Sequence, residues 1–140
     1  MYDLIRFSVG ALVFFGLCGL AIWRGGWPER TVAVAILVGS FLTPVVQIHG
    51  SADGLEPWVF LIDFSFMLLV VGVALKSDRW WPLFCAAYAL LVASSHFARS
   101  LNEGIRQYAY ISGAVLWSYA AVLALGLGVW ELERRRRLAR

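Results

Sequence analysis

Residues 58–75 read WVFLIDFSFMLLVVGVAL, and this block decides the class of fold. It contains no lysine or arginine and a single acidic residue, Asp63. As an α-helix that rises about 1.5 Å per residue, a block of this length crosses most of the roughly 30 Å hydrocarbon core of a bilayer. We therefore predict that residues 58–75 form a membrane-spanning helix.

The composition extends this prediction to the whole chain. Of the 140 residues, 61% are hydrophobic and only 15% are charged, whereas about 25% are charged in soluble domains. So few charges cannot cover a water-facing surface, and the apolar residues come in long blocks that point to lipid as their solvent. The length is that of one ordinary domain. Composition and length together exclude a separate soluble domain.

Four further apolar blocks resemble the first, at residues 7–23, 31–48, 83–98 and 108–130. Pro28, Pro57 and Pro82 each stand just ahead of a block, where a residue without an N–H is tolerated because the first helical turn has no partner for it. The predicted fold is all-α. It is a single transmembrane domain, residues 1–140, built as an integral membrane bundle of five transmembrane helices.

The basic residues predict the orientation of this bundle. With five spans, one side of the membrane receives only Arg6, Arg99 and Arg106. The other side receives nine basic residues: Arg24, Arg30, Lys76, Arg79, Arg134, Arg135, Arg136, Arg137 and Arg140. Because basic residues accumulate on the cytoplasmic side, we predict an outside N-terminus and a cytoplasmic C-terminus with a basic tail over residues 131–140. The arginine run follows a span directly, which favours a membrane anchor over nucleic-acid binding.

Small residues at four-residue spacing predict where the helices touch. Lipid is as apolar as leucine, so membrane helices associate where small side chains let their backbones approach closely. Such stripes occur in three of the blocks: Ala35 and Gly39, Ala89 and Ala93, and Ala120, Ala124 and Gly128. We expect these faces to be buried against neighbouring helices. The stripes alone leave open whether one of them serves a partner chain.

Asp63 is the most costly residue of the sequence in a membrane. It lies about six residues into its block, roughly 8 Å below the outer end by helical rise. A carboxylate at that depth costs a few kcal/mol unless it is protonated, hydrated or paired. Two interpretations follow: a site for a proton, a cation or a polar ligand group, or a structural pair with a neighbouring helix.

His96 is the expected companion of Asp63, because it lies toward the same side of the membrane in another block. A polar pocket in the outer half is geometrically allowed, with the candidate members Gln47, His49, Asp63, Ser95, His96 and Arg99. Asp63 could accept a hydrogen bond from His96 or Arg99. Between a ligand or proton site and a hydrogen-bonded cluster that locks helices together, we favour the cluster.

Other chemistry finds little support in the sequence. No HExxH, GxSxG, P-loop or GxGxxG motif occurs, so no catalytic residue is assigned. Cys18 and Cys85 lack the spacing of a metal site, and none is predicted. His49 and His96 as axial haem ligands are disfavoured, because His49 stands beside Gly50 in a loop. A quinone or lipid headgroup in the outer pocket stays open, because it needs only a histidine and a carboxylate or amide.

Several short segments together resemble a known group of proteins. They are WPER at 27–30, SDRWWPL at 77–83, HFAR at 96–99, LWSY at 116–119 and the closing arginine run. The chain resembles small bacterial inner-membrane proteins of unknown function, typical of alphaproteobacteria. The resemblance implies a multi-pass protein of the bacterial cytoplasmic membrane, and it brings no activity and no cofactor.

Two functions of different classes follow from these patterns. The first is a non-enzymatic accessory or scaffold subunit that associates with other membrane proteins or with itself, in contact with membrane lipids. It is motivated by the short loops, the absent catalytic motifs and the small-residue faces. The alternative is a protein that binds or transfers a proton or a small molecule, such as a quinone or lipid, around Asp63 and His96.

Overall fold

In the described part of the chain, every regular element of secondary structure is an α-helix. The structure, a computed structural model, describes residues 2–49, 57–101 and 107–140, with the backbone only for residues 2–7, 47–49, 99–100, 107–112 and 114. The described residues form five helices: α1 Tyr2–Arg24, α2 Trp27–His49, α3 Pro57–Lys76, α4 Trp81–Leu101 and α5 Gln107–Leu138. Each predicted apolar block lies inside one of these helices, so the all-α prediction is confirmed.

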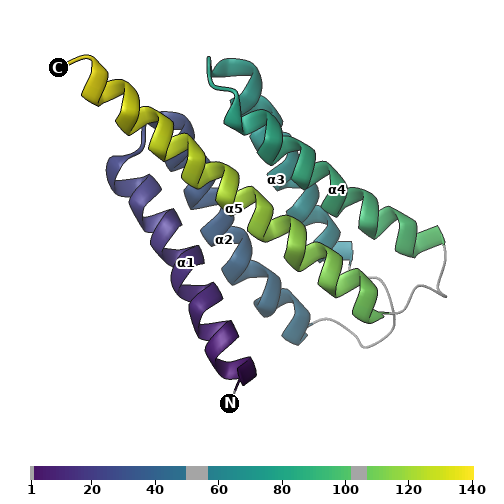
Figure 1. The fold of residues 1–140 in the computed structure, drawn as a ribbon. Coiled ribbons are helices and arrows are strands. Elements are labelled where there is room, and N and C mark those ends of the chain that lie inside the picture. Colours follow the sequence, from purple (N-terminus) through teal and green to yellow (C-terminus); the bar gives the residue numbers. More distant parts are fainter. Residues whose placement is uncertain (1, 50–56, 102–106) are drawn as a thin grey trace.

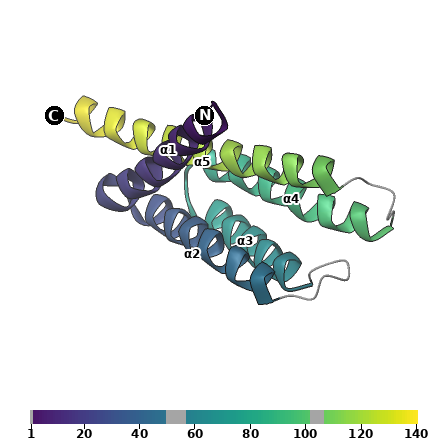
Figure 2. The same ribbon diagram turned by 90° about the horizontal axis from the view of Figure 1, so that it is seen from below.

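The five helices run up and down in chain order and close into a bundle. Each helix packs against the next, and α5 returns to pack against α1, with its most extensive contact on α4. Figure 1 shows the two termini at opposite ends of the bundle, and Figure 2 shows α2 and α3 together on one side of it. We call the end that carries the α1–α2 turn, the α3–α4 turn and the C-terminus the arginine end.

Four of the described helices are long and apolar enough to cross a membrane. The qualifying stretches are Trp27–Val46, Pro57–Lys76, Trp81–Ala98 and Val115–Leu138. The described apolar part of α1, Ser8–Arg24, is shorter. The bundle is therefore suited to a multi-pass membrane protein. Crossing by α1 as a fifth span, and the orientation of the bundle, remain predictions.

The basic C-terminal residues continue the last helix. Helix α5 continues without a break to Leu138, well past the predicted end of its span. Arg24 Nη1 contacts Glu133 Oε1 at 2.8 Å, and Arg136 Nη1 donates to the carbonyl oxygen of Arg24 at 2.8 Å. The last turns of α5 are thus joined to the end of α1. The predicted basic tail is thus helical up to Leu138, and its cytoplasmic location stays a prediction.

The apolar core lies in the half of the bundle next to the arginine end. Its buried members include Cys18 of α1, Val32 of α2, Val70 of α3 and Cys85 of α4. From α5, Leu125 enters the same cluster. These residues stand in the C-terminal halves of α1, α3 and α5 or in the N-terminal halves of α2 and α4. The elements are therefore packed most tightly where the short α1–α2 and α3–α4 turns bring them together.

The small-residue stripes are buried to different degrees. Ala89, Ala93, Ala124 and Gly128 are buried as expected, and Ala120 is half-buried. Ala35 and Gly39 are only half-buried, and they line an open groove between α2 and α3. A Cβ atom added at Gly39 would meet nothing closer than Ile62 Cγ2, at 3.9 Å. The small-residue stripe of α2 thus faces α3, but side chains of α3 do not fill the space over it.

At Gly128 a side chain of α4 lies directly against the backbone of α5. The indole ring of Trp81 lies over this glycine and is fully buried. A Cβ atom at position 128 would stand 2.5 Å from Trp81 Nε1 and 2.6 Å from Cδ1, which no van der Waals contact allows. Only a glycine can occupy this position while the ring keeps its place.

We predict that Gly128→Ala lowers the thermal stability of the detergent-solubilised protein. The added methyl group must displace a buried ring, and overpacking of this kind costs roughly 1–3 kcal/mol. Circular dichroism during heating measures the change. Gly72→Ala is the matched control, because a Cβ atom at Gly72 meets nothing within 4 Å and alanine favours the helix. Equal stability of the two variants would contradict the close approach.

Candidate functional site

Asp63 and His96 form a hydrogen-bonded pair between α3 and α4. His96 Nε2 lies 2.7 Å from Asp63 Oδ2. The histidine is buried, with 5% of its surface exposed, whereas 29% of the Asp63 side chain is exposed. The structure thus brings together the two residues that the sequence analysis put at the centre of the polar pocket.

Helix periodicity explains why the two side chains meet. Asp63 lies four residues after Val59 and seven before Val70, so it shares the buried stripe of α3. His96 follows Ala89 and Val92 at spacings of seven and four, on the buried stripe of α4. The two stripes face each other where α3 packs on α4. Asp63 and His96 therefore occupy positions on the packing faces where an apolar residue would be expected.

Aromatic side chains surround the pair on the α3 side. The ring of Phe60 lies 5.8 Å from the His96 ring in an edge-to-face arrangement, and it stacks on Phe64 at 5.7 Å. An apolar surrounding strengthens a hydrogen bond and makes an unpaired polar group costly. The rings therefore favour the paired state of Asp63 and His96 over separation of the two side chains.

Of the remaining candidates of the predicted pocket, Ser95 is the one whose side chain the structure describes, and it bonds elsewhere. The Ser95 hydroxyl donates to the carbonyl oxygen of Leu91 in its own helix, at 2.8 Å. The side chains of Gln47, His49 and Arg99 lie outside the described residues. The candidate site therefore consists of Asp63 and His96 in the part of the chain that the structure describes.

The arrangement is suited to holding a proton. A carboxylate and an imidazole in contact can share the proton on Nε2, and imidazoles commonly serve in proteins as groups that transfer protons. The exposed part of Asp63 gives the pair access to the surface of α3, while His96 stays covered. Within the described part of the chain, no group of three or more His, Cys, Asp and Glu side chains is placed to hold a metal ion.

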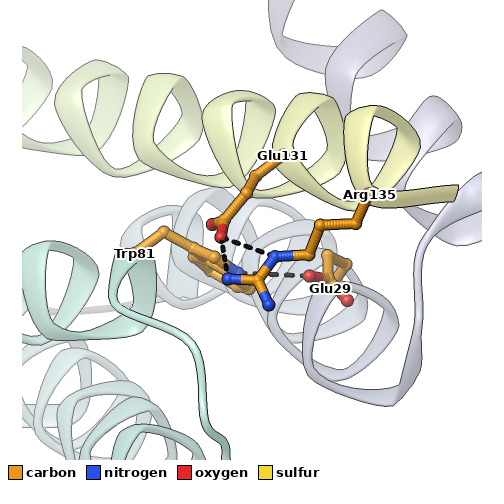
Figure 3. A network of polar contacts seen from close by, with 4 residues as sticks. All are labelled: Glu29, Trp81, Glu131 and Arg135. Atoms are coloured by element: carbon orange, nitrogen blue, oxygen red, sulfur yellow. Dashed lines mark hydrogen bonds and ion pairs between the residues drawn. The ribbon is translucent and has the colours of Figure 1, made fainter. Parts of the chain in front are cut away.

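A second buried carboxylate, that of Glu29, lies at the arginine end. Glu29 is fully buried at the start of α2. Its Oε1 accepts a hydrogen bond from Trp81 Nε1 at 3.1 Å, and its Oε2 accepts one from the backbone N–H of Gly26 at 2.9 Å. Figure 3 shows Glu29 and Trp81 beneath the last turns of α5.

Glu29 was not identified as a buried residue from the sequence, although the local sequence predicts one of its two hydrogen bonds. Gly26 directly precedes α2, and Glu29 is the third residue of that helix. A glutamate at the third helical position often reaches back to the N–H before the helix, as in a capping box. The bond from Trp81 has no such local signal, because 52 residues separate the two side chains.

The environment of Glu29 marks it as a structural group. Both of its oxygens accept hydrogen bonds, and neither donor, the backbone N–H of Gly26 or the indole N–H of Trp81, titrates near neutral pH. Nearby on α5, Glu131 Oε1 accepts two bonds from Arg135, at 3.0 and 2.6 Å (Figure 3). The bond from Trp81 to Glu29 ties α4 to α2, whereas the Glu131–Arg135 pair lies within α5. The Asp63–His96 pair is therefore the better candidate for a functional site.

Comparison with known proteins adds no family to these observations. No protein-family model, curated protein or solved structure matches this chain. The resemblance to small bacterial inner-membrane proteins stays a prediction.

We predict that Asp63→Asn and His96→Gln are energetically coupled. Because the two side chains bond to each other, the double variant should lose less stability than the sum of the single variants. The expected coupling is roughly 1–2 kcal/mol, the upper range for side-chain pairs in membrane bundles. Thermal unfolding of the four proteins in the same detergent measures it.

Ser95→Ala supplies the control for this cycle. Its hydroxyl bonds to its own helix, so its effect should add to that of Asp63→Asn within about 0.5 kcal/mol. Additive effects of Asp63→Asn and His96→Gln would mean that the pair does not form in solution.

Proposed function

We propose that the protein is a multi-pass membrane protein that takes up and releases a proton at the Asp63–His96 pair. The single observation that carries the proposal is the 2.7 Å contact between two titratable side chains within membrane-spanning helices. A lipid-soluble small molecule with a polar head, such as a quinone, is the class of ligand that such a pair would serve.

The cost of the pair supports this proposal. Ionisable side chains within membrane helices cost a few kcal/mol, and they commonly mark proton relays or ligand sites. Asp63 lies six residues after Pro57, roughly 9 Å from the start of α3 by helical rise. An apolar pair at the same two positions would hold α3 and α4 together without that cost.

The proposed setting is a bacterial cytoplasmic membrane, with α1 as a fifth span. Nine basic residues at the arginine end favour a cytoplasmic location for that end. The N-terminus would then be outside, and the Asp63–His96 pair would lie in the outer half of the membrane. This orientation gives the exposed part of Asp63 access to protons from the outer side.

We predict that a pH jump produces an infrared carboxyl signal from Asp63 in the reconstituted protein. A proton taken up or released at the pair changes the hydrogen bond of the carboxyl group, and its infrared band responds. Asp63→Asn should remove one carboxyl band from the infrared difference spectrum, and His96→Gln should change the same band. Asp78→Asn is the matched control, because Asp78 is an exposed aspartate in the α3–α4 turn.

The spectra also separate this function from a structural role. A structural pair would leave the difference spectrum unchanged in both variants while their thermal stability falls. That combination would overturn the proposed function. A wild-type signal that survives in Asp63→Asn would also exclude Asp63 as the responding group.

An accessory or scaffold subunit is the second candidate, and one observation favours it. Only 17% of the residues in the apolar stretches of α2 and α3 are buried within the bundle, against 33% for α4 and 39% for α5. The α2–α3 side therefore offers the larger uncovered apolar surface, as expected for a helix pair that packs against another membrane protein.

We predict for this second candidate that a photo-crosslinking residue at Phe41 or Leu68 captures protein in native membranes. Both side chains are exposed, on α2 and α3 respectively. The same residue at Leu123, exposed on α5, is the control and should capture less. Gel electrophoresis separates a copy of the chain from a different partner by mass. Equal, lipid-only products at all three positions would contradict the accessory role.

A further inference from the structure

The groove between α2 and α3 is polar at one end only. It has a volume of about 640 Å³, and apolar side chains such as Val38, Leu42 and Phe66 line its walls. Arg30 stands at the arginine end of this groove, and its side chain is exposed. Among the residues that the structure describes, no carboxylate pairs with Arg30.

The hydroxyl groups that line the groove already donate hydrogen bonds to backbone carbonyl oxygens. Thr31 donates to the carbonyl oxygen of Trp27 at 2.8 Å, and Ser65 donates to that of Leu61 at 2.7 Å. Both bonds lie within the helix that carries the side chain. The guanidinium of Arg30 is therefore the only donor that the described groove residues offer to a ligand. An occupant must combine an anionic head with an apolar body.

The length of the groove fits one leaflet of a bilayer. From Arg30 to Leu42 the α2 wall extends roughly 18 Å by helical rise. Half of a hydrocarbon core of about 30 Å is of similar length. Trp27, exposed one turn before Thr31, marks the interfacial level at which tryptophan rings gather. A phospholipid with its phosphate at Arg30 would therefore extend one acyl chain along the groove.

We propose that this groove binds an anionic phospholipid of the leaflet next to the arginine end. The phosphate pairs with Arg30, and one acyl chain lies over Ala35 and Gly39, where small residues leave the space that the chain fills. This site is distinct from the Asp63–His96 pair. Ile62 and Phe66 face the groove, whereas Asp63 lies on the side of α3 that packs on α4.

Native mass spectrometry of the full chain tests the proposal. The protein is reconstituted in vesicles of equal parts phosphatidylglycerol and phosphatidylcholine, then released into detergent. Wild type should retain one phosphatidylglycerol per chain in preference to phosphatidylcholine. Arg30→Gln should lower that preference about fivefold, as expected for loss of one basic residue near an anionic headgroup. Arg30→Lys should keep most of it.

Two control variants match these changes. Lys76→Gln removes a basic residue at the same end of the bundle but outside the groove, and it should leave retention unchanged. Gly39→Leu should fill the groove and release both lipids. Gly72→Leu, at an α3 glycine with open space around it, should not. Circular dichroism verifies that each variant is helical, and Arg30→Gln tests the site even if Gly39→Leu fails to fold.

Two results would overturn the proposal. One is equal retention of phosphatidylglycerol by wild type and Arg30→Gln. The other is a dimer of wild type that Gly39→Leu dissociates with no change in bound lipid, which would assign the groove to a second copy of the chain.

Discussion

A carboxylate removed from water must find hydrogen-bond donors, and the two donors of Glu29 set the geometry of one end of the bundle. The N–H of Gly26 fixes the turn between α1 and α2, and the Trp81 indole fixes the start of α4 against it. Trp81 in turn lies on Gly128 of α5. One buried group thereby connects four helices, and the apolar core is assembled around this end.

The second polar contact has a different character. Glu29 is fully buried and meets groups that do not titrate near neutral pH. Asp63 is partly exposed and meets a histidine, the side chain whose charge changes most readily at physiological pH. The contacts of Glu29 satisfy two N–H donors, that of Gly26 before α2 and that of the packed Trp81 ring. The second contact places a carboxylate and an imidazole in contact on the packing faces of α3 and α4, which is the physical basis for the proposed proton site.

The open side of the bundle follows from where the core lies. Tight packing toward the arginine end uses the C-terminal halves of α1 and α3 and the middle of α5, and α2 contributes Val32 and Ala33 there. Farther along α2, the small residues Ala35 and Gly39 face α3 without filling the space between the helices. The space that remains is an apolar groove with one cation at its end. Such a groove is complementary to a lipid with an anionic headgroup.

Sequence by itself determined the number and apolar character of the helices, because these depend on blocks of neighbouring residues and on Pro28, Pro57 and Pro82 ahead of them. It also brought Asp63 and His96 under consideration together, because a charge in such a block is costly. Only the tertiary structure decided which side of each helix meets which neighbour. The 2.7 Å contact of Asp63 with His96, the bond from Trp81 to Glu29 and the unfilled groove join residues that are distant in the chain. Such contacts depend on how each helix is rotated about its axis, and that rotation is set by packing of the whole bundle.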